Sequence, residues 1–170
     1  MFTEEIKIPY DRIAVLIGQR GATKNFLEGK LGVKIKVSSS TGEVNLQSDD
    51  SLKLFIARQV VSAIARGFNP EVAVMLLDDQ NSFELINIKD FSKGNITVSR
   101  GRLIGTEGRA RKYIEQLTDT YIIIYGKTVG IIGHTKNVFI ARKAIENLLR
   151  GSKHGNVYAM LEKNRRKNSA

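Results

Sequence analysis

The chain has 170 residues, a net charge of +10 and no cysteine, which excludes disulfides, thiolate metal sites and cysteine nucleophiles. No segment approaches the roughly 18 consecutive apolar residues of a membrane helix, and the first five residues are acidic rather than a basic leader. These features predict a cytoplasmic protein with either one sizeable core or two small ones.

The first part of the chain predicts a strand at 5–9 and a short helix at 12–17 that stops at a glycine loop. Apolar residues at helical spacing predict a second helix around 26–30, and alternation predicts a strand at 33–37 with a second strand to follow. A long helix closes this unit; its capping candidates are Asp50 and Ser51, and its apolar stripe comprises Leu52, Phe55, Ile56, Gln59, Val60, Ala63 and Ile64.

A short connection follows at 68–81. Asn69 as a cap and Pro70 as the first helical residue predict a short helix there. Because the residues at 72–77 are largely apolar, we expect this helix to pack between the two halves of the chain and to hold them as one rigid body.

The second half repeats the same order of elements. It predicts a strand at 83–88, a helix at 101–104 that stops at a glycine loop, a second helix around 113–117, and a hairpin over 121–132 that turns at Gly126. The closing helix is expected to be capped by Thr135 and to face the core through Val138, Ala141, Ile145 and Leu148.

The two halves are copies of one unit. Ile17–Gly21 recurs as Ile104–Gly108 at an offset of 87 residues, whereas Phe55–Arg58 recurs as Phe139–Arg142 at an offset of 84. The change of offset predicts that the hairpin of the second copy is three residues shorter.

Each copy places a G-x-x-G sequence between two helices, at Gly18–Gly21 and at Gly105–Gly108. Glycine lets the backbone turn sharply and lets a sugar-phosphate chain approach closely, and the next helix points its free N–H groups at phosphates. This placement is typical of KH modules, which clamp about four nucleotides. The predicted fold is therefore α+β, with two tandem type I KH domains at 1–67 and 82–151, a linker with a short helix at 68–81, and a basic, helical C-terminal extension at 152–170.

Other glycine and histidine motifs are weaker. Gly29–Gly32 closes a helix and Gly130–Gly133 lies at a strand end, so both are interpreted as structural. Gly126-Lys127-Thr128 resembles the end of a nucleotide-binding P-loop, but the required earlier glycine is missing and the lysine does not open a helix. His134 and His154 have no carboxylate cluster beside them, so we interpret the first as a turn residue and the second as a surface or RNA contact. The sequence predicts no enzyme, no cofactor and no metal site.

The positive charge is unevenly distributed. Residues 1–80 contain ten basic and ten acidic side chains and have no net charge, whereas residues 81–170 contain 17 basic and seven acidic ones and hold the whole excess. This asymmetry favours a nucleic-acid partner, with the second domain as the main RNA reader.

The residues resemble a known family, the archaeal two-KH proteins related to the eukaryotic small-subunit assembly factors called partner-of-Nob-one and KRR. The segments that carry this resemblance most specifically are Gly101–Gly105 followed by Gly108-Arg109, then Tyr125–Val129, and finally His154–Tyr158 with Leu161–Lys163. The resemblance implies ribosome biogenesis, binding near the 3′ end of the small-subunit ribosomal RNA, and contact with the endonuclease that trims it.

The candidate RNA contacts lie in and beside both loops. Arg20 suits a phosphate, whereas Glu107 at the equivalent place in the second loop would repel one, so that loop is expected to bind through its basic flanks. Ile17 and other isoleucines are expected to contact bases in the adjacent groove. The full set is Gly18, Gln19, Arg20, Gly21, Lys24, Ile35, Arg100, Arg102, Ile104, Gly105, Thr106, Glu107, Gly108, Arg109, Arg111, Lys112, Ile122 and Ile124, with tail contacts at Lys163, Arg165, Arg166 and Lys167.

Two alternatives to ribosome assembly remain open. One is a general binder of single-stranded RNA or DNA, of the regulatory or exosome-accessory kind. The other is a scaffold that uses its KH surfaces to bind proteins. Salt dependence and RNA preference distinguish them, because only a nucleic-acid clamp loses affinity steeply as salt is added.

Overall fold

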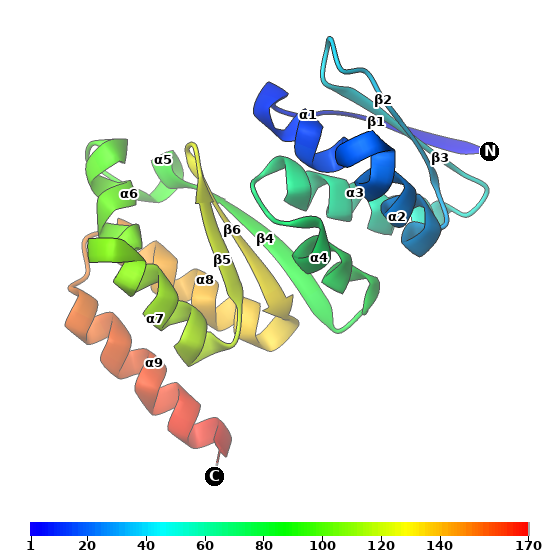
Figure 1. The fold of residues 1–170 in the computed structure, drawn as a ribbon. Coiled ribbons are helices and arrows are strands. Elements are labelled where there is room, and N and C mark those ends of the chain that lie inside the picture. Colours follow the sequence, from blue (N-terminus) through cyan, green and yellow to red (C-terminus); the bar gives the residue numbers. More distant parts are fainter. Residues whose placement is uncertain (170) are drawn as a thin grey trace. The chain divides into compact units, whose positions relative to one another are not determined.

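The computed structural model describes residues 1–169, and the chain divides after Asp79 into two compact units. Each unit has the β-α-α-β-β-α order that the sequence predicts (Figure 1), so the α+β fold class is confirmed. The first unit contains β1 (Phe2–Lys7), α1 (Tyr10–Ile17), the 3₁₀ turn η1 (Gln19–Gly21), α2 (Ala22–Leu31), β2 (Lys34–Val37), β3 (Glu43–Ser48), α3 (Ser51–Ala65), α4 (Pro70–Ala73) and η2 (Val74–Leu77).

The second unit repeats this order with one additional helix and with one long helix in place of α4 and η2. A short helix, α5, lies between the first strand and the helix before the glycine loop, and a long helix, α9, follows the closing helix. The elements are β4 (Asn81–Asn87), α5 (Ile88–Phe91), α6 (Ile96–Ile104), η3 (Thr106–Gly108), α7 (Arg109–Thr118), β5 (Tyr121–Tyr125), β6 (Thr128–His134), α8 (Thr135–Leu149) and α9 (His154–Ser169).

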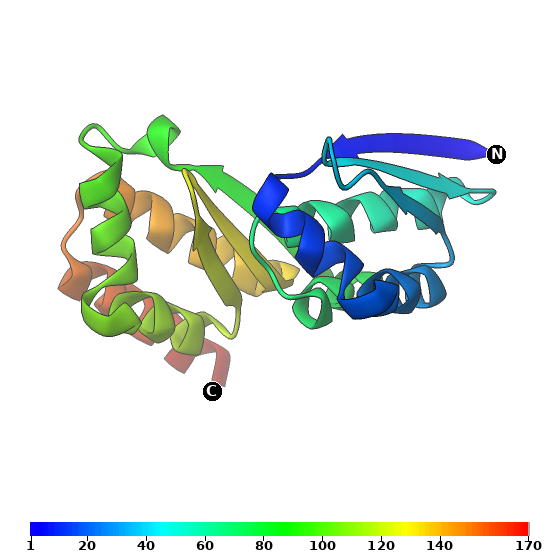
Figure 2. The ribbon, with the colours of Figure 1, turned by 45° about the horizontal axis from the view of Figure 1, so that its top comes forward.

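The last strand of each repeat lies in the middle of its sheet. The strand orders are β1-β3-β2 and β4-β6-β5, and neighbouring strands are antiparallel. In the first sheet Val44 pairs with Ile6 and Leu46 pairs with Ile35, and the side chains of Val44, Leu46 and Ile35 are almost completely buried. Alternating side chains of the central strand therefore face the helices, which cover one face of the sheet (Figure 2).

The hairpins account for the change of offset between the copies. Residues 38–42 join β2 to β3, whereas only Gly126 and Lys127 join β5 to β6. The prediction of a hairpin shorter by three residues is confirmed. Gly126 adopts a positive φ of 57°, as a tight two-residue turn requires.

The closing helix α3 buries only part of the predicted stripe, namely Val60, Ala63 and Ile64. Its cap is as expected, because an Asp50 carboxylate oxygen accepts from the backbone N–H of Leu52 at 2.9 Å. However, Leu52 and Phe55 are 65% and 60% exposed. The sheet lies on the side of Leu54, Ala57, Val60, Val61 and Ile64, and this choice of face depends on the sheet rather than on the size of the side chains.

The closing helix α8 confirms the predicted inward residues, since Val138, Ala141, Ile145 and Leu148 are buried. Its cap is corrected. His134, rather than Thr135, holds the N-cap position and accepts from the backbone N–H of Lys136 through Nδ1 at 3.3 Å. The Thr135 hydroxyl instead donates to the carbonyl of Gln80 at 3.0 Å, because Thr135 is already the first helical residue.

The segment after α3 belongs to the first unit. Asn69 and Pro70 hold the predicted cap and first helical positions of α4. Both α4 and η2 contact α3, and η2 also contacts α2. Ala73 and Leu76 are buried there, so the apolar residues of this segment extend the core of the first unit.

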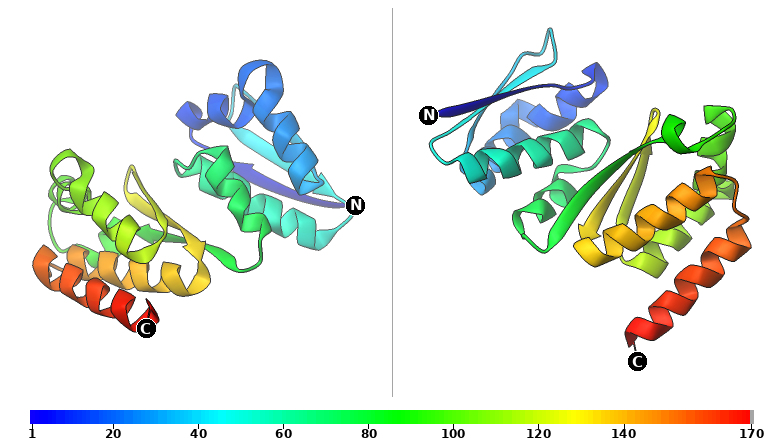
Figure 3. Two further views of the ribbon diagram at one scale, coloured as in Figure 1. Left: turned by 60° about the horizontal axis from the view of Figure 1, so that its bottom comes forward. Right: turned by 180° about the vertical axis from the view of Figure 1, so that it is seen from behind.

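Helix α9 completes the core of the second unit. It begins at His154, within the predicted helical extension, and runs along α7 and α8 (Figure 3). Val157 and Leu161 are buried in the same cluster as Ile114 and Ile145. Within residues 1–169, none of the helices combines the length and apolar character that crossing a membrane requires.

Candidate nucleic-acid interface

The two G-x-x-G loops have the same backbone conformation. The first glycines, Gly18 and Gly105, have φ/ψ of 74°/174° and 76°/174°, and each ends the helix before it. The residues before the last glycines, Arg20 and Glu107, have positive φ values of 54° and 55°. Few residues other than glycine adopt this region, so its recurrence at equivalent positions shows that both repeats build the same loop.

The two glycines of each loop are required for different reasons. A Cβ on Gly18 would lie 2.3 Å from Thr23 Oγ1, and one on Gly105 would lie 2.7 Å from the Ala110 nitrogen. A Cβ on Gly21 would meet nothing within 4 Å. The first glycine therefore permits close packing of the loop on the next helix, whereas the last one only supplies a positive φ and leaves an open surface.

That open surface lies at the start of a helix. Gly21 and Gly108 are the N-cap residues of α2 and α7, and the first turns of these helices contain no acidic residue. The free N–H groups and the positive end of each helix therefore face the loop surface. The predicted loop residues Gln19, Arg20, Thr106, Glu107, Arg109 and Lys112 are exposed or half-buried, and Lys24 is half-buried, so these residues can contact a bound strand.

An apolar pocket of about 470 Å³ adjoins the first loop. Ile13, Ala14 and Ile17 from α1 line it together with Gly18 and Gln19 of the loop, and Tyr10 and Ser39 complete it. The tyrosine is 79% exposed. Sequence reasoning identified Ile17 but missed Tyr10 and Ser39. An aromatic residue directly after Pro9, on the first turn of α1, was the available signal for Tyr10.

The equivalent surface of the second unit is more polar. At the offset of 87, Thr97 and Arg100 replace Tyr10 and Ile13, while Ile104, half-buried, replaces Ile17. Arg100 is also half-buried, and among the described residues its Nε has no hydrogen-bond partner. The two units thus offer an apolar surface and a cationic surface at the same place in the repeat.

The expectation that Ile35 and Ile122 contact bases is corrected, whereas Ile124 is half-buried and stays a candidate. Ile35 and Ile122 are 1% and 4% exposed, because alternate residues of β2 and β5 point under the helices. Ile124 lines a small internal cavity of about 10 Å³ together with Ile122. Ile35 and Ile122 therefore support the groove from within the core.

Two predicted RNA contacts have structural partners within the second unit. Arg102 donates to the carbonyls of Leu148 at 2.5 Å and Ser152 at 2.6 Å, and it thereby caps the end of α8. Arg111 pairs with Glu115 at 2.7 Å, one turn further along α7. Because buried carbonyls and carboxylates need such partners, these arginines hold the fold rather than present a free charge.

The predicted tail contacts differ in their surroundings. Arg165 donates to the carbonyl of Gln116 at 2.5 Å and lies 3.5 Å from Asp119, so it attaches α9 to α7. Lys163, Arg166 and Lys167 are exposed. His154, which the sequence placed at the surface or on RNA, is half-buried, and its Nε2 lies 2.8 Å from the carbonyl oxygen of Arg102. The histidine therefore connects α9 to the helix that ends at the second loop.

The Glu107 side chain is 76% exposed and lies 3.5 Å from Arg109 across the loop surface. An exposed ion pair of this length contributes little to stability. The carboxylate lies at the surface position that Arg20 occupies in the first loop, so the two loops share one backbone conformation but carry side chains of opposite charge.

The competing motifs have the structural positions that the sequence predicts. Gly32 caps α2 with a φ of 66°, and Gly29 lies within that helix. Gly130 and Gly133 belong to β6, where a Cβ on Gly133 would lie 3.0 Å from Thr120. Gly126 and Lys127 form the turn between β5 and β6, whereas the lysine of a P-loop opens a helix.

Comparisons with known proteins agree with this geometry. A profile for the KH domain matches residues 3–61, and a profile described as a eukaryotic type KH domain (KH-domain type I) matches residues 82–166. A KH domain-containing protein of Methanocaldococcus jannaschii is 43% identical over 96% of this chain and 74% of its own length. The RNA-binding protein pno1 of Dictyostelium discoideum is 32% identical over 92% of this chain and 69% of its own length.

A solved structure extends the comparison to three dimensions. The chain matched in a crystal structure of an a/eIF2α–aDim2p–rRNA complex from Pyrococcus horikoshii is 44% identical, with a TM-score of 0.91 over 98% of this chain and 95% of that chain. The likeness covers both units in sequence and in fold. The chain belongs to the family of two-KH-domain proteins that includes archaeal Dim2p and the eukaryotic RNA-binding protein pno1.

Proposed function

We propose that this protein binds single-stranded RNA through its two KH units and acts in ribosome biogenesis as a ribosomal-RNA-binding factor. The observation that carries the proposal is the recurrence of one loop geometry, with positive φ at Arg20 and Glu107 and a helix N-terminus behind each loop. Open loop surface and helix N–H groups suit a sugar-phosphate backbone, and the adjacent surfaces suit bases.

The charge distribution supports the same function. All of the net charge of +10 lies in residues 81–170, and Lys112 with Arg109 brings part of it to the second loop. The relatives of this chain include a protein named as RNA-binding and a chain whose structure was solved in a complex with rRNA. An RNA partner follows from both observations, and the chemistry of the site is binding rather than catalysis.

The finer part of the proposal concerns the target. We infer that the RNA is the region near the 3′ end of small-subunit ribosomal RNA, where the protein would also meet the endonuclease that trims this end. Two clamps on one chain raise the effective concentration of the second contact, by about 10² or more when one strand reaches both. The exposed tail residues Lys163, Arg166 and Lys167 are further candidate phosphate contacts.

The test is the affinity of the protein for single-stranded oligomers tiled along small-subunit ribosomal RNA, with Gly21→Asp and Gly108→Asp variants. Aspartate adds a negative charge on each loop, and neither position has a close neighbour for the new side chain to hit. We expect tight binding to 3′ segments, weakened by either variant and most by Gly108→Asp if the second unit is the main reader.

The control is Gly29→Asp, which adds the same charge at a glycine of α2 that also faces open space, away from the loop. Circular dichroism of every variant shows that the fold is retained. Equal affinity for unrelated strands would favour a general single-strand binder. Failure of every oligomer to bind better than a scrambled one would overturn the RNA clamp and leave a protein-binding scaffold.

A further inference from the structure

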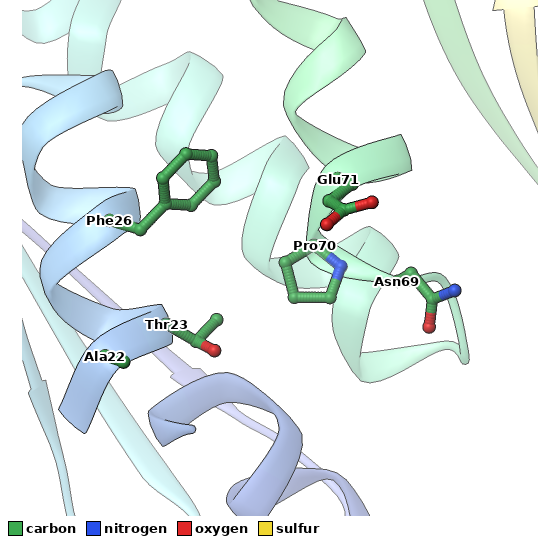
Figure 4. Close-up of a pocket in the computed structure, with 6 residues that line it drawn as sticks. All are labelled: Ala22, Thr23, Phe26, Asn69, Pro70 and Glu71. Carbon is green, nitrogen blue, oxygen red and sulfur yellow. The ribbon is translucent and has the colours of Figure 1, made fainter. Parts of the chain in front are cut away.

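A second pocket of the first unit lies behind the loop, between α2 and the start of α4. It has a volume of about 450 Å³. Ala22, Thr23 and Phe26 line it from α2, and Asn69, Pro70 and Glu71 line it from the start of α4 (Figure 4). The pocket therefore begins one residue after the last glycine of the first G-x-x-G loop.

The internal repeat shows why this place is open. Phe26 corresponds to Tyr113 at the offset of 87, and Pro70, which begins α4, corresponds to His154, which begins α9, at the offset of 84. In the second unit the helix continues, and the ring of Tyr158 meets that of Tyr113 edge-on at 4.8 Å. In the first unit α4 ends at Ala73, and Val74, which has no ring, stands where the same offset places Tyr158.

The second unit also shows which chemistry fits there. Besides the ring of Tyr158, the carboxylate of Glu162 approaches the Tyr113 hydroxyl, which donates to it at 2.5 Å. An aromatic ring and a hydrogen-bonded carboxylate thus fill the position beside α7. Beside α2, Phe26 likewise supplies an aromatic wall, and Glu71 supplies a carboxylate from a different position of the repeat, but the space between them is open.

The walls of this space suit a planar heterocycle. The side chain of Phe26 is 40% exposed, and Figure 4 shows its ring and the Glu71 carboxylate on opposite sides of the opening, with Thr23 and Pro70 below. Among the described residues Glu71 forms no hydrogen bond or ion pair, so its oxygens are available as acceptors. Base stacking on aromatic rings and hydrogen bonds to the Watson–Crick edge are the usual means of reading an unpaired base.

We propose that this pocket binds a nucleobase, with guanine preferred, from the nucleotide next to the segment held at the first loop. Guanine presents two neighbouring donors, N1–H and the 2-amino group, and these match the two oxygens of a carboxylate. The proposal rests on the proposed RNA-binding function. Phe26 follows Gly21 by five positions along α2, a rise of about 8 Å, which one nucleotide can span. Arg20, which is exposed one residue before Gly21, supplies a cation for its phosphate.

The experiment uses the full chain and oligomers that hold the best four-nucleotide segment constant while the flanking nucleotide on either side is guanosine, uridine or abasic. We expect guanosine on one side to bind at least about fivefold tighter than the abasic flank, which is the low end of stacking on an aromatic side chain. Phe26→Ala removes this gain for every base. Glu71→Gln removes the preference for guanosine over uridine while keeping the stacking gain.

Phe55→Ala and Glu43→Gln are the matched controls, because they change an exposed phenylalanine and an exposed glutamate elsewhere in the same unit. A second readout is photo-crosslinking with 6-thioguanosine at the flank, which is expected to label residues within 22–30 or 69–77. Equal affinity for all flanks, or crosslinks outside these segments, would overturn the proposed base pocket. The proposed RNA-binding function would still stand in that case if the oligomers bind and Gly21→Asp abolishes their binding. If no oligomer binds at all, both proposals fail.

Discussion

The Glu115 carboxylate accepts a hydrogen bond from the backbone N–H of Ile122 at 2.8 Å, and it joins the second helix of the repeat to the strand that follows. The first unit repeats this contact, because Glu28 accepts from the N–H of Ile35 at 2.9 Å. In both units the donor belongs to an almost fully buried strand residue. The carboxylate therefore satisfies a backbone group that would otherwise be buried without a partner.

Replacing Glu28 with alanine is expected to lower the free energy of unfolding by about 1–3 kcal/mol, because the Ile35 N–H loses its acceptor. Glu28→Gln keeps a carbonyl oxygen at the same distance and is expected to lose less. Chemical denaturation checks the stability, and amide hydrogen exchange at Ile35 checks the location. Unchanged exchange at Ile35 in the alanine variant would contradict the assignment.

Alanine at the two glycines of the first loop is expected to have unequal effects. Gly18→Ala places a Cβ 2.3 Å from Thr23 Oγ1 in a backbone region that only glycine adopts freely, so we expect a loss of roughly 1–3 kcal/mol or more. Gly21→Ala meets no neighbour and has only the cost of a positive φ, about 1–2 kcal/mol. Thermal unfolding of the two variants compares them; a larger loss for Gly21→Ala would show that the loop packs differently.

Exchanging the charge at the positive-φ position is expected to change RNA affinity in opposite directions. Arg20→Glu should weaken RNA binding and make it less dependent on salt, because the side chain no longer neutralises a phosphate. Glu107→Arg should strengthen RNA binding and make it more dependent on salt. Each phosphate that a side chain neutralises steepens the slope of log affinity against log salt by about 0.7 for a single strand. Titrations at several salt concentrations measure this slope, and a salt slope that stays constant in both variants would place the phosphate elsewhere.

The contact between Tyr113 and Glu162 predicts a pH effect on helix α9. The hydrogen bond to Glu162, then burial and the nearby negative charge, raise the pKa of Tyr113 above its ordinary 10.0. A raised folded-state pKa means that the stabilisation is complete below the unfolded value near 10 and is lost as the pH rises through the higher folded value. Amide exchange in residues 154–168 is therefore expected to accelerate at high pH.

Tyr113→Phe is the matched variant for this effect, since it removes the hydroxyl and keeps the ring against Tyr158. We expect faster exchange in α9 already at neutral pH and a smaller further change when the pH is raised through the same range. Exchange that accelerates equally in both proteins would assign the pH effect to another group.

The amino-acid sequence by itself determined the repeat and its order of elements. Identical spacing around Gly18 and Gly105, and a change of offset between the loop and the closing helix, predicted both units and the shorter hairpin of the second. These features are local, because glycine at a positive φ and period-two or helical alternation follow from the backbone of a few neighbouring residues.

Only the tertiary structure decided which side chains are free to bind. Arg102 and Arg111 have the same charge as Lys112, but distant carbonyls and a nearby carboxylate bind them, and no sequence spacing reveals the carbonyls of Leu148 and Ser152. Likewise Ile35 and Phe55 are both apolar, yet the sheet buries the first and leaves the second exposed. Burial and hydrogen-bond partners depend on residues far apart in the chain, so they are settled only when the elements pack.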